Sequence, residues 1–387
     1  MILFFLSVSL LAVYISLLVF YRMGWRSAPL FKYSIQNQPS VFITVVISAR
    51  NEELSLPLLL QSLKDQLYSQ TNFEIIIVDD HSTDKTASIA RNFPMDNIRV
   101  VQLNEFVLTK INAYKKKALE VAISFAKGEL IVTTDADCIV PVTWLHSIAS
   151  FYEQKKPAFI VMPVLITYQK NFLEIFQALD FMTLQGITGA TVHKKFHSMC
   201  NGANLAYTKQ AFIDAGGFQG IDTIASGDDM LLMHKISVMQ PEKIMYLKSD
   251  SVIVTTTPMH TLKDFFNQRI RWASKADQYD DRKILPVLVF VYLFNFMLLT
   301  LPVIAVFKND LIKMNDLHIS LMQGWLFLLT IKTLAEVYFL YPVATFFNQQ
   351  NLLYFFPLLQ PFHIMYTVIA GWLGKFGTYK WKERKVK

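Results

Sequence analysis

The sequence predicts an α/β domain with a parallel sheet, joined at both ends to apolar helices that are long enough to cross a membrane. The first observation is composition: 53% of the 387 residues are hydrophobic and only 17% are charged, which is too apolar for an ordinary soluble protein. The second is that the middle of the chain alternates between strand-like and helix-like patterns. The third is that polar, acid-rich loops directly follow several of the strand-like runs.

An N-terminal membrane anchor is predicted over residues 1–22. Ile2–Tyr21 contains no charged residue and is long enough to cross the roughly 30 Å hydrocarbon core of a bilayer as a helix. A signal peptide is less favoured, because the run has no basic region before it, is too long, and lacks a small-residue cleavage site. Basic residues follow directly, namely Arg22, Arg26 and Lys32. Such flanking residues stay on the cytoplasmic side, so we expect the next domain in the cytosol.

Residues 40–275 are expected to form one α/β domain that ends in an interfacial helix. Val41–Ser48 is a nearly continuous β-branched run, as a strand buried on both faces should be. The patterns that follow predict strands and helices in alternation: helix Leu54–Leu67, strand Phe73–Val78, helix Lys85–Phe93, strand Asn97–Leu103, helix Lys115–Ala126 and strand Glu129–Thr134. Strands that alternate with helices form a parallel sheet covered by helices.

Polar loops follow three of the predicted strands. They are Ala49-Arg50-Asn51-Glu52, Asp79-Asp80-His81 and Asp135-Ala136-Asp137. Ligands of parallel α/β sheets sit beyond the carboxyl ends of the strands, so we expect the three loops to converge on one site.

Each acidic pair in these loops has a structural and a functional interpretation. Helix capping explains the segment Ser82-Thr83-Asp84. Capping does not require two further carboxylates at Asp79 and Asp80, which repel each other unless a donor such as a base edge or a ribose lies nearby. Asp135 and Asp137 form either an ordinary turn or a pair of hard oxygen ligands for Mg²⁺ or Mn²⁺, which would bridge the two phosphates of a donor.

Two further polar clusters lie later in the domain. Gly227-Asp228-Asp229 precedes an apolar helix start, so one carboxylate is explained as an N-cap while the second is free to act as a general base. Gln268-Arg269-Ile270-Arg271-Trp272 lies in an amphipathic stretch, Leu262–Ala276. This stretch is either an interfacial helix with a snorkelling Arg and a belt Trp, or a helix that also contacts phosphate through Arg and stacks an acceptor on Trp.

Taken in order, these motifs resemble a membrane-anchored family 2 glycosyltransferase with a GT-A fold. The segments that carry the resemblance, over about residues 41–275, are VVISARNEE, EIIIVDDHSTDKT, KKKAL, GELIVTTDADC, CNGANLAY, GGF, GDDM and QRIRW. The resemblance implies an inverting transfer from a nucleotide-sugar donor, a UDP- or GDP-sugar, with Mg²⁺ or Mn²⁺ as the cofactor.

The resemblance also implies roles for single residues. Contacts with the donor fall on Ser48, Glu52, Asp79, Asp80, Lys115, Asp135, Gln268, Arg271 and Trp272. Asp137 matches the metal ligand, with Asp135 supporting it. Asp229 matches the catalytic base, with Asp228 beside it. The chain departs from the family pattern at Asp228, where glutamate is usual. The shorter side chain leaves the class of acceptor open.

A C-terminal membrane region of two to three segments is expected over residues 284–374, followed by a basic tail over residues 375–387. Its apolar segments are Ile284–Phe307, Leu317–Phe347 and Leu352–Gly374. Three crossings after a cytosolic domain would place the tail outside, yet its basic residues favour the inside. Pro357, Gln360, Pro361 and His363 interrupt the last segment, so a re-entrant or interfacial path is the alternative.

Lys332 and Glu336 stand four residues apart within an otherwise apolar segment. Charges in lipid are costly unless they are paired or face a polar cavity. The pair therefore either fixes helix packing, or Lys332 marks a groove that receives the headgroup of a lipid acceptor.

We therefore expect an integral protein of a bacterial inner membrane that acts on a lipid or glycan acceptor. The net charge of +7 does not indicate nucleic acid, because the basic residues cluster near predicted membrane boundaries. Cys138 and Cys200 are expected to be reduced and buried beside the site. A processive polysaccharide synthase would share the motifs, but needs a polymer channel, for which four spans are few. A non-catalytic receptor or transporter would explain the spans but not three convergent acidic loops.

Overall fold

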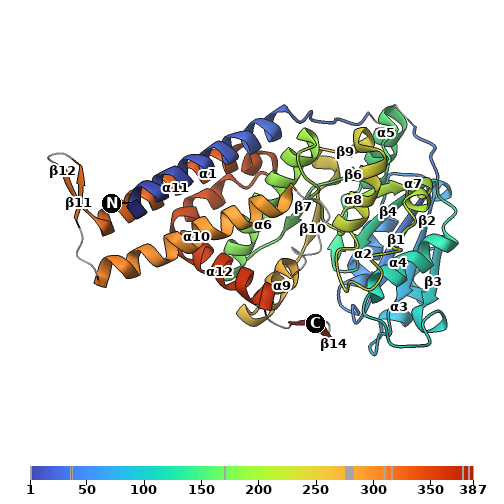
Figure 1. Cartoon of the computed structure of the whole chain (residues 1–387). Helices are drawn as coiled ribbons and strands as arrows, with labels where there is room; N and C mark the ends of the chain where they lie inside the picture. Colours follow the sequence, from blue (N-terminus) through green and yellow to red (C-terminus); the bar gives the residue numbers. More distant parts are fainter. Residues whose placement is uncertain are drawn as a thin grey trace.

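The computed structural model of the chain describes residues 2–34, 36, 38–169, 171–274, 283–307, 311–314, 317–376, 379–381 and 384–386. The molecule is elongated and has two parts (Figure 1). An α/β part lies at one end, and a bundle of long helices lies at the other. Helix α1 (Ile2–Ser27) runs along the bundle and leads into the α/β part.

The α/β part is built on a seven-stranded sheet with the strand order β3-β2-β1-β4-β8-β6-β9. The strands are β1 (Ile43–Ala49), β2 (Phe73–Asp79), β3 (Ile98–Gln102), β4 (Leu130–Asp135), β6 (Phe159–Val161), β8 (Leu205–Thr208) and β9 (Ile244–Tyr246). β1 pairs in parallel with β2 and with β4, and β2 pairs in parallel with β3. The predicted parallel sheet is therefore confirmed for its first four strands, with ends displaced by one or two residues.

The later strands do not appear in the prediction. β8 pairs antiparallel with both β4 and β6, which makes the sheet mixed. A second, three-stranded sheet consists of β5 (Cys138–Ile139), β7 (Val164–Ile166) and β10 (Val254–Thr256). Most of these strands are only two or three residues long, too short for an alternating pattern to reveal them.

Helices cover both faces of the main sheet. They are α2 (Leu56–Lys64), α3 (Thr86–Asn92), α4 (Tyr114–Phe125), α5 (Trp144–Lys155), α7 (Lys209–Asp214) and α8 (Met230–Met239). Val45 and Ile47 of β1 belong to the apolar cluster that includes α2 and α5, whereas Val46 belongs to the cluster that includes α4. The continuous apolar run of β1 reflects burial on both faces.

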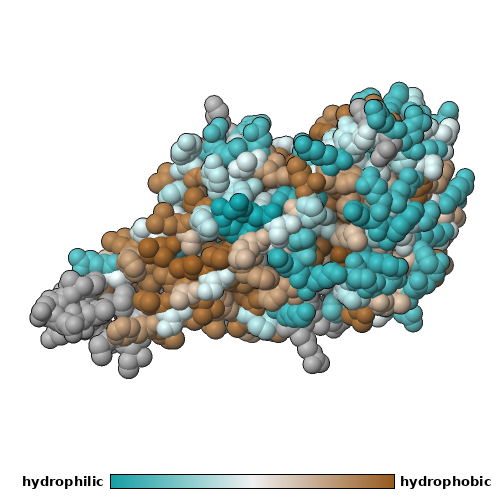
Figure 2. Space-filling model, turned by 90° about the horizontal axis from the view of Figure 1, so that it is seen from above, coloured by the Kyte–Doolittle hydropathy of each residue, from teal (hydrophilic) through white to brown (hydrophobic). Residues whose placement is uncertain are grey.

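Within the described residues, four helical segments are long and apolar enough to cross a membrane. They are α1, α10 (Ile284–Phe307), α11 (Leu321–Phe346), and the segment Gln350–Phe376, which joins a 3₁₀ turn to α12 (Phe356–Phe376). Brown, apolar side chains predominate on the bundle, and teal, hydrophilic side chains on the α/β part (Figure 2). A hairpin of β11 (Leu311–Met314) and β12 (Leu317–Ser320) joins α10 to α11 at the end remote from the sheet (Figure 1).

Two helices link the α/β part to the bundle. Helix α6 (Phe172–Lys194) packs so closely on α1 that a Cβ atom added at Gly24 would lie 3.0 Å from the Cβ of Ala190. Helix α9 (Leu262–Ala273) packs against α12, where the rings of Phe265 and Phe362 are 6.3 Å apart. α9 corresponds to the predicted interfacial helix, of which residues 275–276 lie outside the described residues.

The segment after α11 enters the bundle from the α/β end and returns to that end. At its start, Phe347 stacks on Trp25 near the end of α1, with 6.5 Å between the rings. Gln360 lies deeper in the bundle, where its Oε1 accepts a hydrogen bond from Lys332 Nζ of α11 (2.9 Å). At the end of α12, Gly374 lies against α9. β13 (Tyr379–Trp381) and β14 (Arg384–Val386) then pair antiparallel, with β13 beside α9.

Candidate functional site

The loops after β1 and β2 are locked together by hydrogen bonds. The N–H group of Asn51 donates to Ser82 Oγ (3.0 Å), and the N–H group of Thr83 donates to Asn51 Oδ1 (2.9 Å). Asp84 Oδ1 accepts from the N–H group of Thr86 in the first turn of α3 (2.9 Å). Of the three residues expected to cap this helix, Asp84 satisfies an N–H group of its first turn, although the N-cap position is Lys85. Ser82 and Thr83 join the two loops instead.

Asp80 is held in place at the end of β2. Its Oδ1 lies 2.9 Å from Nδ1 of His81, a residue with the left-handed backbone angle φ of 57°. The ring of Tyr114 meets the His81 ring edge-on at 5.5 Å, and Arg50 Nη1 donates to the Asp80 carbonyl (2.9 Å). These contacts orient the Asp80 carboxylate.

Lys115 joins the loop after β4 to the segment before α8. Its Nζ donates to Asp135 Oδ1 (2.7 Å) and lies 3.2 Å from Asp228 Oδ2. Burial lowers the pKa of Lys115, but attraction to Asp135, Asp228 and Asp229 outweighs burial and holds the pKa above its usual range. The amine therefore stays charged between the two acidic motifs.

Asp229 is the N-cap of α8. Its Oδ1 accepts from the N–H group of Met230 (2.8 Å) and its Oδ2 from the N–H group of Gly202 (3.1 Å). A Cβ atom at Gly202 would lie 3.3 Å from both Asp228 Oδ2 and Lys115 Nζ, so glycine permits this close approach. One carboxylate of the pair caps the helix, as expected. The capping carboxylate belongs to Asp229, the residue to which the family resemblance assigns the role of catalytic base.

Helix α9 brings Gln268, Arg271 and Trp272 to the same region. Trp272 packs against Phe181 of α6, with 6.1 Å between the ring centroids. Gln268 Oε1 is buried and accepts no hydrogen bond from any residue the structure describes. A buried acceptor of this kind is normally satisfied, and the N–H or O–H group of a ligand would satisfy it.

Side chains from these loops and from α9 line one cavity of about 1300 Å³. The predicted site residues that line it are Ser48, Glu52, Asp80, Lys115, Asp135, Asp137, Asp228, Asp229, Gln268, Arg271 and Trp272. The structure thus brings together every predicted site residue except Asp79.

Asp79 points elsewhere. It is 3% exposed and does not line the cavity. With the Gln102 amide oriented to satisfy both of its neighbours, the amide nitrogen donates to Asp79 Oδ2 (2.9 Å) and the amide oxygen accepts from Arg91 (2.7 Å). Successive side chains of a strand point to opposite faces, so Asp79 and Asp80 cannot both face the cavity. The predicted donor contact of Asp79 is therefore absent from this arrangement.

Two carboxylates that could hold a divalent cation lie at the end of β4. Asp135 and Asp137 both line the cavity, and carboxylates are the ligands that Mg²⁺ and Mn²⁺ prefer. Among the described residues, no group of three or more His, Cys, Asp or Glu is arranged to hold a metal. The residues fit a cation that is bound together with phosphate oxygens.

The cavity continues between the long helices. Its wall there comes from α1, α6, α10, α11 and α12 and includes apolar residues such as Leu17, Leu288 and Ala370. The polar residues on this wall include Asp180, Arg269, Glu336, His363 and Tyr366.

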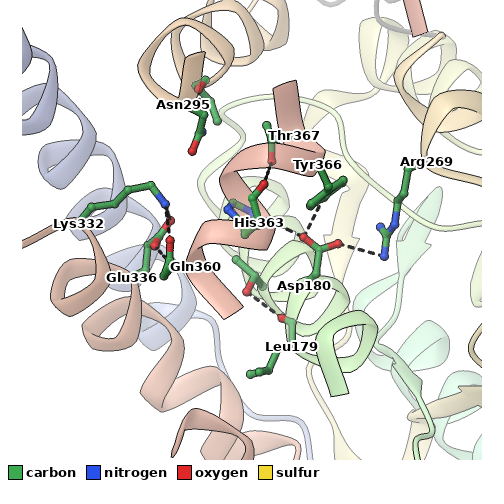
Figure 3. Close-up of polar contacts among 12 residues, drawn as sticks. Leu179, Asp180, Arg269, Asn295, Lys332, Glu336, Gln360, His363, Tyr366 and Thr367 are labelled. Carbon is green, nitrogen blue, oxygen red and sulfur yellow. Dashed lines mark hydrogen bonds and ion pairs between the residues drawn. The ribbon is translucent and has the colours of Figure 1, made fainter. Parts of the chain in front are cut away.

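Lys332 does not line this cavity. It is fully buried, and its Nζ donates to Glu336 Oε1 (2.7 Å) and Gln360 Oε1 (2.9 Å), as Figure 3 shows. Tyr14 Oη also donates to Glu336 Oε1 (2.5 Å). Of the two interpretations of the Lys332 and Glu336 pair, the structure therefore supports helix packing and not a headgroup contact by Lys332.

Sequence reasoning missed Asp180, Arg269 and Gly202. Arg269 lies inside the QRIRW motif, and Gly202 inside CNGANLAY, but neither was given a role. Asp180 is an acidic residue within an apolar helical run, which is itself a signal of a buried partner. Cys138 and Cys200 are buried and do not form a disulfide, and Cys200 lines the cavity, as expected.

Two family models match the sequence. Glycosyl transferase family 2 matches residues 44–214. Glycosyl transferase family group 2 matches residues 130–373, which is more than half of the chain and includes α10, α11 and most of α12.

Beta-monoglucosyldiacylglycerol synthase from Nostoc sp. is 29% identical over 246 residues, or 61% of this chain and 49% of that protein. The chain thus spans about half the length of that relative. Probable glycosyltransferase YdaM from Bacillus subtilis is 25% identical over 351 residues, or 82% of this chain and 79% of that protein.

A solved structure, the mannosyltransferase PcManGT from Pyrobaculum calidifontis in complex with GDP-Man and Mn²⁺, has a TM-score of 0.54 at 18% identity. The similarity covers 96% of this chain and 98% of that one. It is a likeness of fold and confirms the GT-A architecture.

Proposed function

Because the chain belongs to the glycosyl transferase family group 2, we propose that it transfers a sugar, with inversion, from a nucleotide-sugar donor to a membrane lipid. One observation carries the proposal. The cavity that receives the acidic loops of the sheet is continuous with a largely apolar space between the long helices. A lipid acceptor therefore has a path to the same place as a soluble donor.

Donor binding is assigned to the carboxyl ends of β1, β2 and β4. Ser48, Glu52 and Asp80 would contact the nucleoside, as the cavity lining supports. Asp137, with Asp135, would hold the Mg²⁺ or Mn²⁺ that neutralises the leaving diphosphate when bound. Arg271, and Lys115 between its two carboxylates, add positive charge near the phosphates.

Asp229 acts as the general base. The N–H groups of Gly202 and Met230 hold its carboxylate at the cavity wall. It takes the proton of the acceptor hydroxyl while the hydroxyl oxygen attacks the anomeric carbon. The bond from that carbon to the diphosphate breaks on the opposite face, so one displacement inverts the configuration. Asp228, paired with Lys115, orients the neighbouring charges.

The α/β part would lie in the cytosol of a bacterial cell, with the bundle in the inner membrane. Arg22 and Arg26 at the end of α1 support this orientation. In this arrangement a cytosolic nucleotide sugar reaches the site directly.

The test is to incubate the detergent-solubilised protein with UDP- and GDP-sugars and with dioleoylglycerol, undecaprenyl phosphate or no lipid. Nucleoside diphosphate release and lipid-linked sugar are measured together. We expect release with one class of donor to rise when one of these lipids is present, and one sugar to be added. No stimulation by either lipid would contradict the proposal. A ladder of long products would instead identify a processive polysaccharide synthase.

A further inference from the structure

Asp180 connects three helices at the point where the cavity passes from the α/β part into the bundle. It lies on α6, and its Oδ2 is 3.0 Å from Arg269 Nη2 on α9. Its Oδ1 accepts a hydrogen bond from Tyr366 Oη on α12 (2.9 Å), and His363 Nε2 of the same helix lies 3.7 Å away. Figure 3 shows these groups converging on the one carboxylate.

Arg269 contacts both Asp180 and the ring of Trp272. The Cζ atom of Arg269 lies 4.4 Å from the centroid of the Trp272 ring and 5.1 Å from that of Phe265. The side chains of Arg269 and Asp180 are 3% and 5% exposed. Within the described part of the chain, the guanidinium nitrogens of Arg269 make no hydrogen bond, and the ion pair with Asp180 and the two ring contacts hold them. A guanidinium that is stacked on a ring and tethered by a carboxylate restricts the orientation of that ring.

Stability alone does not explain a buried pair at this place. The desolvation of two charges offsets much of their attraction, and apolar residues of similar volume often serve as well. What the pair supplies is a single arrangement of α6, α9 and α12. Each of these helices contributes residues to the cavity wall.

We propose that Asp180 is a positioning residue for the lipid acceptor. Through Arg269 it holds Trp272, and through Tyr366 it holds α12, so that a headgroup in the cavity is aligned with Asp229. The proposal rests on the proposed function and adds the element that orients the acceptor.

The bundle offers a matched control. Lys332 and Glu336 also form a buried ion pair, but their hydrogen bonds go to Tyr14 of α1 and Gln360 of α12, and not to α9. Lys332→Met therefore breaks a pair of the same kind without touching the Arg269 and Trp272 contact.

The first measurement needs no acceptor. The chain contains six tryptophans, so protein labelled with 5-fluorotryptophan gives a small set of ¹⁹F resonances, and Trp272→Phe identifies that of Trp272. We expect Asp180→Asn to shift or broaden the Trp272 resonance and Lys332→Met to leave it unchanged. An unmoved Trp272 resonance in Asp180→Asn would overturn the proposal.

The second measurement separates alignment of the acceptor from general damage. With UDP-glucose and dioleoylglycerol or undecaprenyl phosphate, we expect Asp180→Asn to lower the kcat/KM of transfer about 10- to 100-fold. Donor KM and lipid-free hydrolysis of UDP-glucose should change less than about twofold, because the proposal places Trp272 against the acceptor, and not against the donor as the family resemblance implies. Equal loss of transfer and hydrolysis would reduce Asp180 to a structural role.

A double variant distinguishes a specific loss of transfer from a loss caused by misfolding. Asp180→Asn combined with Arg269→Gln leaves no unpaired buried charge and should restore thermal stability, while Trp272 stays displaced and transfer stays low. Recovery of transfer together with stability would overturn the proposal. Failure of the proposed function is distinguishable, because wild-type protein would then transfer to neither lipid while the ¹⁹F shift still reports on Asp180.

Discussion

Asp228 and Asp229 are adjacent and chemically identical, so their neighbours must assign their roles. Asp228 is paired with Lys115, which also binds Asp135. Asp229 accepts two backbone N–H groups and faces the cavity. The first is therefore part of an ion cluster, and the second is fixed by the backbone.

Asp229→Asn is expected to reduce turnover by about two to four orders of magnitude, because an amide cannot accept the acceptor's proton. Asp228→Asn should cost less, since Lys115 keeps Asp135 as a partner. The check is kcat at saturating donor and lipid, with nucleotide affinity measured by calorimetry. Greater damage from Asp228→Asn would move the base to Asp228.

Asp137→Ala should abolish transfer while leaving the solubilised protein folded, because Asp137 is the proposed metal ligand. EDTA should have the same effect on the wild type, and excess Mg²⁺ or Mn²⁺ should reverse it. The measurements are lipid glycosylation and thermal unfolding. Full activity in EDTA would contradict the proposal that transfer requires a divalent metal ion.

Single residues were predictable where a motif ends a strand. Asp80, Asp135 and Asp137 lie at the carboxyl ends of parallel strands, so the topology brings them together. Asp79 is the last residue of β2, and because side chains alternate along a strand it faces away from the cavity that Asp80 lines. The contact between Asp180 and Arg269 joins helices far apart in sequence, and no local pattern encodes it.

Elements were predictable where the pattern is long. The first four strands and helices α2 to α4 follow from apolar periodicity, and α9 from its amphipathic spacing. β8 and the short strands around it complete a mixed sheet, and their pairing depends on contacts that are non-local. The buried Lys332 shows how tertiary contacts decide between two interpretations that the sequence leaves open.

Lys332→Met is expected to lower the free energy of unfolding by about 3–5 kcal/mol, because Glu336 is left buried without its cation. Adding Glu336→Gln should recover most of the loss. Thermal unfolding in detergent measures both variants. Unchanged stability of the single variant would show that the pair contributes little to helix packing.

The whole molecule is organised around one cavity, whose wall is polar at the sheet and largely apolar between the long helices. The sheet presents acidic loops to water, and the bundle presents apolar walls to the same space. The path of the segment after α11, from Phe347 beside α1 to Gly374 of α12 beside α9, favours a re-entrant segment and so a tail on the α/β side. This path would resolve the conflict between three crossings and a basic tail.

Topology is testable with single cysteines, because native Cys138 and Cys200 are buried. We expect Ser320→Cys, at the end remote from the sheet, to react with a membrane-impermeant maleimide added to intact cells. Lys385→Cys should react only after permeabilisation. Labelling of both from outside would contradict the re-entrant path.

In the proposed function, a lipid reaches Asp229 through the space between the helices. The most direct measurement is the ratio of lipid glycosylation to lipid-free donor hydrolysis in two variants of α12. Thr367 lines the cavity, whereas Ile369 is exposed and does not. We expect Thr367→Trp to lose lipid glycosylation and keep hydrolysis, and Ile369→Trp to keep both. Normal glycosylation in Thr367→Trp would contradict this proposal.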